Sequence, residues 1–494
     1  MLNPAQKELL KALLSQLSQD QKTWLAGYMQ GLTGGDVSGS TSPVANKATV
    51  DVYYATETGN SKGLSLNVMK ALKGAGYKVK STAVNRVKPE DISKDNVAIF
   101  LASTHGEGDP PETAVKFFDL MKEAKDGLLD GLQYAVLGLG DKTYEIFCGA
   151  ATSLDTELLR LGGKPLQDIA LFDVDYATHT PKWIEDTIST LNKIYGDGAG
   201  DAFGSVTVSE DEIPALRTGK GYTRLEPVKG VIKDIINLND RGSNKETYHI
   251  EIAYDDDVTY TPGDAVGILL PLGEESGDLT PRLYSIASSP SLHEGEVHLT
   301  VALAKHMNED GSIGHGLSSG FLAGKKAGDE LDFYISQNQI FNLPRDDQDA
   351  IMIGPGTGIA PFRSFIHERS ERGASGRNWL IFGDQHAHCD FLYQAEWQEH
   401  LAMETLHHLD LAFSRDQDFK IYVQDRLKEK ADELIEWIDN GAVIYLCGNK
   451  DPMSKDVDRT LIELIAAKKD MSTDAAEDYL AELEETGRYL KDVY

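Results

Sequence analysis

The sequence predicts a multidomain protein that combines two α/β domains with a β-barrel. Apolar strand-like runs alternate with helical segments from Ala48 to Tyr195 and again from Ala350 onward, a pattern typical of parallel sheets covered by helices. After Pro227, six short strand-like runs are broken by Gly, Pro and Asp, as in an antiparallel barrel. A chain of 494 residues has room for several hydrophobic cores.

The expected order of domains follows from these patterns and from two segments of linker composition. Leucines recur at helical spacing near the N-terminus, in a helical pair too small to bury its apolar stripe alone. It must pack on a neighbour or on another copy of itself. We expect an N-terminal helical oligomerisation segment (1–33), a linker (34–47), a doubly wound α/β domain (48–195), a flexible linker (196–226), a barrel (227–345) and a second α/β domain (346–494).

The predicted strands can be stated individually. In the first α/β domain they are Thr49–Tyr54, Lys78–Ala83, Val97–Ala102, Tyr134–Leu139 and Asp168–Phe172. In the barrel they are Val228–Leu238, Glu246–Tyr254, Ala265–Leu270, Leu283–Ala287, Glu296–Ala304 and Glu330–Ile335. In the second α/β domain they are Ala350–Ile353, Asn378–Phe382, His407–Phe413 and Val443–Cys447.

Charge and cysteine content exclude some classes of function. Lysine and arginine number 48 against 79 acidic residues, for a net charge of −31, so a nucleic-acid binder is not expected. A solvated acidic surface accounts for most of these charges, and docking to a basic partner is the alternative. Three widely spaced cysteines favour a reducing compartment. With no signal peptide and no membrane-spanning apolar run in the sequence, we expect a cytoplasmic protein.

Three loops of the first domain suit a phosphate-bearing aromatic ligand. Each follows a predicted strand, so all three leave the carboxyl edge of the sheet, where ligands bind. The first offers hydroxyls and backbone N–H groups at a helix N-terminus, which is an anion site. The residues concerned are Thr56, Glu57, Thr58, Gly59, Asn60 and Ser61; Ser103, Thr104, His105 and Gly106; and Leu139, Gly140, Asp141, Tyr144 and Cys148.

These motifs resemble the flavodoxin-like FMN domain of diflavin reductases. The resemblance implies that the first loop holds the FMN phosphate, and that the other two flank the isoalloxazine ring with Tyr144 stacking on it. Many members have an aromatic residue where this chain has His105. For His105, ring contact and a solvent-facing loop position remain equal alternatives.

A second motif, in the barrel, suits a dinucleotide. Arg282 can neutralise a pyrophosphate, and Tyr284 lies on the same side of its strand, where it can stack on a flat ring. The block resembles the ferredoxin–NADP reductase family. That resemblance implies an FAD site in which Arg282 and Ser319 bind pyrophosphate, Tyr284 stacks on the ring and Ser285 lies near flavin N5. The residues assigned to this site are Arg282, Leu283, Tyr284, Ser285, Thr300, Val301, Ala302, Gly316, Leu317, Ser318 and Ser319.

The last domain carries a glycine-rich turn after its first strand, followed later by a basic cluster. Glycines Gly354, Gly356 and Gly358 admit a nucleotide backbone at a helix N-terminus. A serine, an arginine and a lysine after the third strand suit a 2′-phosphate and so favour NADP over NAD. The residues assigned to the nucleotide are Gly356, Thr357, Ser414, Arg415, Lys420, Tyr422, Gln424 and, by resemblance, Asp456.

The resemblance also assigns catalytic roles. Ser285, Cys447 and Asp492 are implied to position the nicotinamide for hydride transfer, and Tyr494 to stack on FAD until the nicotinamide displaces it. We expect no metal site.

Among diflavin reductases the chain is most similar to the flavoprotein components of NADPH-dependent sulfite reductases, over almost its whole length. This implies FMN, FAD and NADPH as cofactors and a siroheme and iron–sulfur hemoprotein subunit as partner. One departure is clear: a large connecting insertion of that family is replaced by the short segment Leu270–Leu279. A stand-alone reductase serving another haem or redox protein, and a scaffold that no longer turns over, are the alternatives.

Overall fold

The computed structural model describes residues 48–494 except 57–58, 106–107, 145, 196–216, 256, 272–280 and 309–310. Residues from Lys47 to Tyr494 form one compact unit, and only this unit is discussed below. The expected N-terminal helices, the first linker, most of the second linker and most of the Leu270–Leu279 junction lie outside the described residues. None of the helices in the described ranges combines the length and the apolar character needed to cross a membrane.

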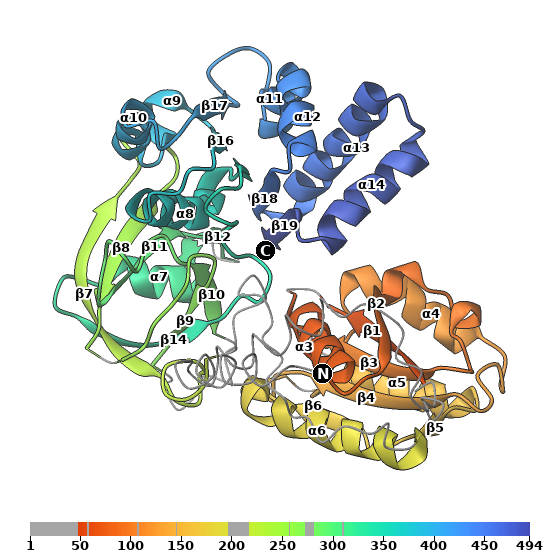
Figure 1. The fold of residues 1–494 in the computed structure, drawn as a ribbon. Helices are drawn as coiled ribbons and strands as arrows, with labels where there is room; N and C mark the ends of the chain where they lie inside the picture. Colours follow the sequence, from red (N-terminus) through yellow and green to blue (C-terminus); the bar gives the residue numbers. More distant parts are fainter. Residues whose placement is uncertain are drawn as a thin grey trace, which may run out of the picture. The chain divides into compact units, whose positions relative to one another are not determined.

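The first domain is a parallel sheet in the order β2-β1-β3-β4-β5, with β6 also paired to β4. Large apolar side chains fill both faces. Helices α4 and α5 pack on one face through Phe117 and Leu154, and α3 and α6 on the other through Leu64 and Trp183 (Figure 1). Its elements are β1 Thr49–Ala55, α3 Asn60–Gly74, β2 Lys78–Ala83, η1 Val84–Arg86, η2 Pro89–Asp91, β3 Val97–Ser103, η3 Glu112–Ala114, α4 Val115–Glu123, β4 Gln133–Leu139, α5 Gly149–Arg160, β5 Lys164–Pro165, β6 Ala170–Phe172 and α6 Tyr176–Tyr195.

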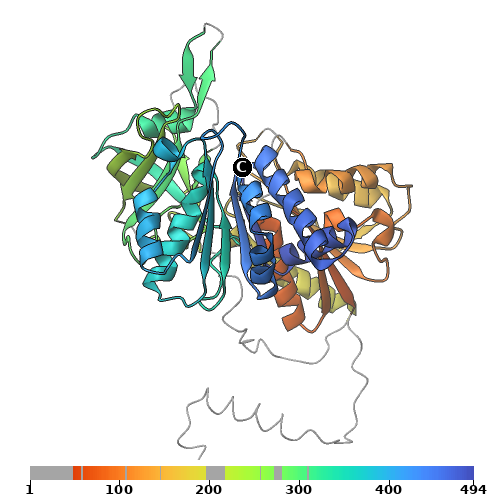
Figure 2. The same cartoon turned by 90° about the horizontal axis from the view of Figure 1, so that it is seen from above.

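The second domain is a six-stranded antiparallel sheet in the order β10-β9-β14-β7-β8-β11. The bridge between Ile286 and Leu299 joins the chain after β10 to β11 and closes the sheet into a barrel. The hairpin of β12 and β13 projects from the barrel (Figure 2) and exposes Met307 and Ile313. The elements are β7 Val228–Asn237, β8 Thr247–Ala253, β9 Ala265–Leu269, β10 Arg282–Ser285, β11 Glu296–Ala302, β12 Lys305–Met307, β13 Ile313–His315, α7 Leu317–Ala323 and β14 Glu330–Ser336.

The third domain is a parallel sheet in the order β17-β16-β15-β18-β19. Successive strands are added on one side of β15 up to β17 and then on its other side from β18, so the strand order reverses between β15 and β18. In such sheets the ligand binds at the reversal, beyond the carboxyl ends of the strands. Its elements are β15 Ala350–Ile353, η4 Gly356–Ile359, α8 Ala360–Glu371, β16 Asn378–Asp384, α9 Ala387–Asp390, α10 Gln394–Ala402, β17 His408–Phe413, α11 Val423–Glu429, α12 Ala431–Asp439, β18 Val443–Gly448, η5 Lys450–Ser454, α13 Lys455–Lys469, α14 Thr473–Glu485 and β19 Tyr489–Val493.

The predicted fold class, two parallel α/β domains and an antiparallel barrel, is confirmed. The ends of the predicted strands differ from the observed ones by at most two residues. Three short strands, β5, β12 and β13, were not predicted. A fourth, β19, was also missed: it is formed by the residues before the C-terminus and pairs in parallel with β18. The segment is short and carries charged residues, so its sequence gives no strand pattern of its own.

Candidate functional site

The phosphate loop of the first domain lies at the N-terminus of α3. Gly59 has φ +90°, a left-handed conformation that glycine adopts without strain. Its backbone N–H donates to the Thr56 hydroxyl at 2.9 Å. The N-cap residue of this 15-residue helix is Gly59, which has no side chain to cap the first turn, so the positive end of the helix dipole faces the loop, as an anion site requires. Glu57 and Thr58 lie outside the described residues.

The loops after β1, β3 and β4 meet as predicted. The hydroxyls of Ser61 and Ser103 are 2.6 Å apart, and the Thr104 N–H donates to the Leu139 carbonyl at 2.9 Å. The Thr104 hydroxyl is buried and has no hydrogen-bond partner among the residues that the structure describes. A buried hydroxyl without a partner is costly, and a ligand oxygen or nitrogen would satisfy it. The loop therefore fits a polar ligand such as FMN.

The remaining residues of these loops divide into exposed and supporting positions. His105 is exposed, and its backbone pairs with that of Asp109 through two hydrogen bonds. Tyr144 is half-buried. Cys148 is fully buried with φ 52°, and burial raises the pKa of its thiol to about 12. Cys148 therefore stays protonated, and its sulfur packs against Gly140. Gly106 is outside the described residues.

A pocket of about 300 Å³ opens at these loops. Asn60, Ser103, Thr104, His105 and Tyr144 line one side. The other side brings in residues that sequence reasoning missed, because they come from distant segments with no motif of their own: Arg217, Tyr222 and Tyr334.

A further missed residue, Arg224, joins the first domain to the segment before the barrel. Its guanidinium lies 2.7 Å from the Asp141 carboxylate. It is only 12% exposed, so solvent screens this ion pair little.

The Arg282–Ser285 motif lies on β10, and the exposure of its side chains differs along the strand. Arg282 and Leu283 are exposed, and Tyr284 is half-buried with its hydroxyl donating to Ser318 at 3.0 Å. The Ser319 hydroxyl is buried and holds its own turn, accepting from Ala304 N–H at 3.2 Å and donating to the Gly316 carbonyl at 3.3 Å. Arg282 and Tyr284 thus remain open to a dinucleotide, which fits FAD, while Ser319 shapes the turn that includes Gly316 and Leu317.

The three residues assigned from β11 lie apart from this motif. Val301 belongs to the barrel core. The Thr300 hydroxyl, on the opposite face, is 2.7 Å from the Tyr393 hydroxyl of the third domain. Ala302 is exposed. The side chains of Thr300 and Val301 are therefore occupied by packing between and within domains.

The three predicted catalytic residues meet at one point. The Ser285 hydroxyl donates to the Asp492 carboxylate at 2.9 Å, and the Cys447 thiol lies 3.9 Å from the same oxygen. Pairing of β18 with β19 sets Cys447 directly beside Asp492. Burial raises the pKa of the Asp492 carboxyl, and burial with the neighbouring Asp492 raises the pKa of the Cys447 thiol well above its usual range. Cys447 is therefore a neutral thiol.

The glycine-rich turn packs against this group. A Cβ on Gly358 would lie 2.1 Å from the Cys447 carbonyl oxygen, so only glycine allows the turn to approach so closely. Gly356 has φ +60° with open space around it. The Tyr494 hydroxyl is 2.9 Å from the Thr357 hydroxyl, and its backbone N–H donates to the Gly448 carbonyl at 3.1 Å. The terminal tyrosine is thus held beside the turn rather than frayed.

The basic cluster follows β17 and is open to solvent. Arg415, Lys420 and Tyr422 are exposed, whereas Ser414 and Gln424 are half-buried. Backbone hydrogen bonds from Ser414 and Arg415 to Asp384 and Gln385 fix the start of the loop. Asp456 pairs with Arg459 on α13. Exposed basic side chains on a fixed loop fit a 2′-phosphate.

Comparisons with known proteins agree with this arrangement. Family models match in three places: Flavodoxin at residues 52–185, FAD binding domain at 270–321 and Oxidoreductase NAD-binding domain at 352–459. The sulfite reductase [NADPH] flavoprotein alpha-component of Bacillus subtilis (strain 168) is 34% identical, over 100% of this chain and 98% of the relative. The chain belongs to this family.

Other members are similarly close. The proteins of the same description from Vibrio cholerae serotype O1 (strain ATCC 39315 / El Tor Inaba N16961) and Shewanella sp. (strain MR-4) are 32% and 31% identical, over 100% of this chain and 96% and 98% of theirs. The alignment with the Bacillus subtilis protein runs over 605 positions against the 494 residues of this chain. The relative thus has long stretches without a counterpart here, consistent with the reduced connecting insertion.

Proposed function

We propose that this protein is an NADPH-dependent diflavin reductase that passes electrons from NADPH to FAD, then to FMN, and finally to the hemoprotein of a sulfite reductase. Bound flavins would supply the hydride acceptance and the single-electron steps, and the protein would position them. The observation that carries the proposal is the convergence of Ser285, Cys447 and Asp492 beside the glycine-rich turn.

The roles of these side chains follow from their contacts. The Ser285 hydroxyl and Cys447 thiol both face one Asp492 oxygen and hold that carboxyl in place. An ionised Asp492 carboxylate would favour the positive charge that a nicotinamide ring gains when it gives up hydride. The neutral Cys447 thiol presents a soft, uncharged surface, and the Tyr494 hydroxyl lies 2.9 Å from the Thr357 hydroxyl of the turn.

The first experiment is a count of flavins. FMN and FAD are extracted from the purified chain, quantified per polypeptide, and the holoprotein is then reduced with NADPH in the presence of a sulfite reductase hemoprotein. One FMN and one FAD per chain, with NADPH-driven reduction of the hemoprotein, are expected. A colourless preparation, or one inert with NADPH and an artificial acceptor, would contradict the proposal and favour a scaffold. Reduction of other haem proteins alone would favour a stand-alone reductase.

The second experiment tests the three-residue group. Asp492→Asn keeps the shape of the side chain and removes its charge, so flavin reduction by NADPH should slow by about a hundredfold, as for loss of one preorganised electrostatic group. Flavin content should stay unchanged. Asp347→Asn, at an exposed carboxylate paired with Arg345, is the matched control. An unchanged rate in Asp492→Asn would remove this residue from the hydride step.

The assembly we propose has two contacts. The hemoprotein is the electron acceptor, and residues 1–33, outside the described residues, join copies of the chain. Light scattering of the chain with and without these residues tests the second contact. A cytoplasmic location is proposed from the three cysteines, all of them buried and free.

A further inference from the structure

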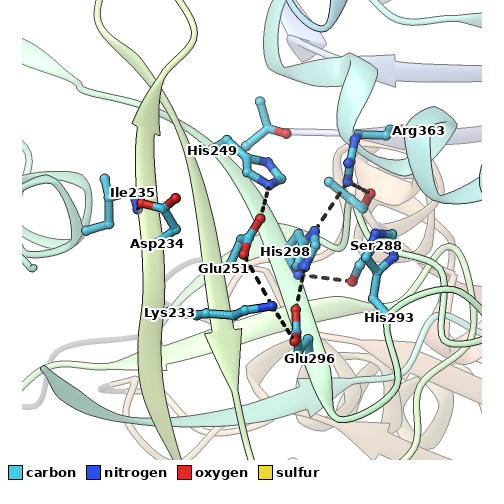
Figure 3. A network of polar contacts seen from close by, with 12 residues as sticks. Lys233, Asp234, Ile235, His249, Glu251, Ser288, His293, Glu296, His298 and Arg363 are labelled. Atoms are coloured by element: carbon cyan, nitrogen blue, oxygen red, sulfur yellow. Dashed lines mark hydrogen bonds and ion pairs between the residues drawn. The ribbon is translucent and has the colours of Figure 1, made fainter. Parts of the chain in front are cut away.

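A group of histidines and glutamates lies on two adjacent strands of the barrel. His249 and Glu251 are two residues apart on β8, and Glu296 and His298 are two residues apart on the adjacent antiparallel β11. Glu251 is directly opposite His298. Since side chains alternate along a strand, all four point to the same face, opposite the core residues Ile250 and Val297. Figure 3 shows the four side chains converging.

The distances suit shared coordination of one ion. His249 Nε2 lies 3.5 Å from a Glu251 oxygen, and His298 Nε2 lies 3.1 Å from a Glu296 oxygen. One ligand atom from each of His249, Glu251 and His298 lies within 4.8 Å of the other two. Zinc binds imidazole nitrogen and carboxylate oxygen at about 2.0–2.2 Å, so its ligand atoms are about 3.3 Å apart. Only small movements separate the observed side chains from that geometry.

Both imidazoles are held inside the protein. His249 and His298 are 4% and 3% exposed, and His298 Nε2 is within hydrogen-bond distance of the Glu296 carboxylate. His249 Nε2 makes no hydrogen bond among the described residues, although it faces a carboxylate. A neutral imidazole nitrogen is a common metal ligand.

The ring of His249 is held in place through its second nitrogen, Nδ1. Its Nδ1 is 3.0 Å from the Tyr393 hydroxyl, which is in turn 2.7 Å from the Thr300 hydroxyl. A partner on the far nitrogen of this kind fixes the ring of a metal-bound histidine. His298 Nδ1 is 3.4 Å from Arg363 Nη1. This is a long contact, and Arg363 has stronger acceptors in the Glu396 carboxylate and the Ala287 carbonyl.

In this structure, which holds no ion, Lys233 neutralises the carboxylates of Glu251 and Glu296. Its ammonium lies 2.7 Å from Glu296 and 3.8 Å from Glu251, at a bulge of β7, and its side chain is 53% exposed. An exposed lysine can swing into solvent at little cost. Lys233 thus acts as a weak competitor for the position between the carboxylates that a divalent cation would take.

We propose that His249, Glu251 and His298, with Glu296 as a fourth ligand, form a binding site for a divalent transition-metal ion of the zinc type. Two imidazoles with carboxylates favour this class over magnesium or calcium, which take oxygen ligands. The bound ion would cross-link β8 to β11 and, through Tyr393, secure the barrel against the third domain. Its effect would be on stability and would not involve electron transfer.

The test uses the flavin-loaded full chain after dialysis against a chelator. Zinc is titrated at pH 7.5 by calorimetry, and the thermal unfolding midpoint is measured with and without it. One tight equivalent and a raised midpoint are expected. Glu251→Gln keeps the size of the side chain and removes its charge. It should weaken zinc binding by at least about tenfold, because losing a residue that only orients a metal ligand already costs that much. Tyr393→Phe should weaken it by about ten- to a hundredfold.

Two further variants separate this site from the alternatives. Lys233→Met removes the competing ammonium and should tighten zinc binding, whereas loss of a purely structural lysine would not. The partly exposed group of His386, His388 and Asp416 could also take zinc, so His386→Gln with His388→Gln is the matched control and should leave the tight equivalent intact. The proposal is overturned if the wild-type chain binds no tight equivalent, if Glu251→Gln leaves binding unchanged, or if only the control variant abolishes it.

Discussion

Arg415 and Lys420 are the residues on which a preference for NADPH over NADH should depend. Both are exposed cations on the loop after β17, where the resemblance to the family places the 2′-phosphate. Replacing both with alanine should raise the KM for NADPH by about a hundredfold and leave that for NADH almost unchanged, since two charge-assisted hydrogen bonds are lost. Lys428→Ala, at another exposed lysine, is the control. Equal losses for the two nucleotides would contradict the assignment.

His400 gives the protein a pH-dependent component of stability. It is 9% exposed, and burial lowers its pKa from 6.5 to about 4. Between these values the unfolded chain binds more protons than the folded one, so the free energy of unfolding is fully maintained above pH 6.5 and declines as the pH falls toward 4. The loss is about 3 kcal/mol at most.

Denaturant unfolding at pH 7 and pH 5 measures this component. His400→Gln should show a smaller decrease in stability between the two pH values than the wild-type chain. His306→Gln, at an exposed histidine on β12, should behave like the wild type. If His400→Gln keeps the full pH dependence, the component does not belong to His400.

At the scale of elements, the glycine-rich turn and β18 fit together closely enough to exclude a methyl group. Gly358→Ala places a Cβ 2.1 Å from the Cys447 carbonyl oxygen, so the turn must move. We expect a loss of about 1–3 kcal/mol in stability and slower flavin reduction by NADPH. Gly324→Ala, whose nearest neighbours would be 3.4 Å and 3.6 Å away, is the matched control for thermal unfolding. Equal midpoints for the two variants would contradict this account.

Strand β19 shows where sequence patterns reach their limit. The strands β15 and β18 are runs of buried apolar residues, and both were predicted. The segment from Tyr489 to Val493 includes a lysine and an aspartate and becomes a strand because it extends the edge of an existing sheet. Its pairing partner, not its own composition, determines its structure.

At the scale of the whole molecule, Arg224 links the loop after β4 to the segment before the barrel. Arg224→Gln breaks the ion pair with Asp141 and should reduce the population in which the two domains are in contact. Electron transfer from FAD to FMN should slow by about tenfold, which corresponds to about 1.4 kcal/mol. Flavin reduction by NADPH should not change.

Rapid mixing with NADPH separates the two steps. The first phase of flavin bleaching reports hydride transfer and should keep its rate in Arg224→Gln, whereas the second phase should slow. Arg345→Gln, at an exposed pair with Asp347, provides a control with the same change of charge. A slowed first phase, or an unchanged second phase, would argue against a role for Arg224 in domain contact.

The sequence by itself determined the fold class, and it predicted the loops that carry the cofactor motifs. These features depend on local periodicity and on residues adjacent in the chain, such as the turn at Gly59 and the β10 motif at Arg282. Only the tertiary structure decided which distant residues meet: Asp492 beside Cys447, Arg224 beside Asp141, and His249 beside His298. Such contacts depend on strand order and domain packing, which bring together residues that are far apart in the chain. No local sequence pattern around these residues indicates which partner they will meet.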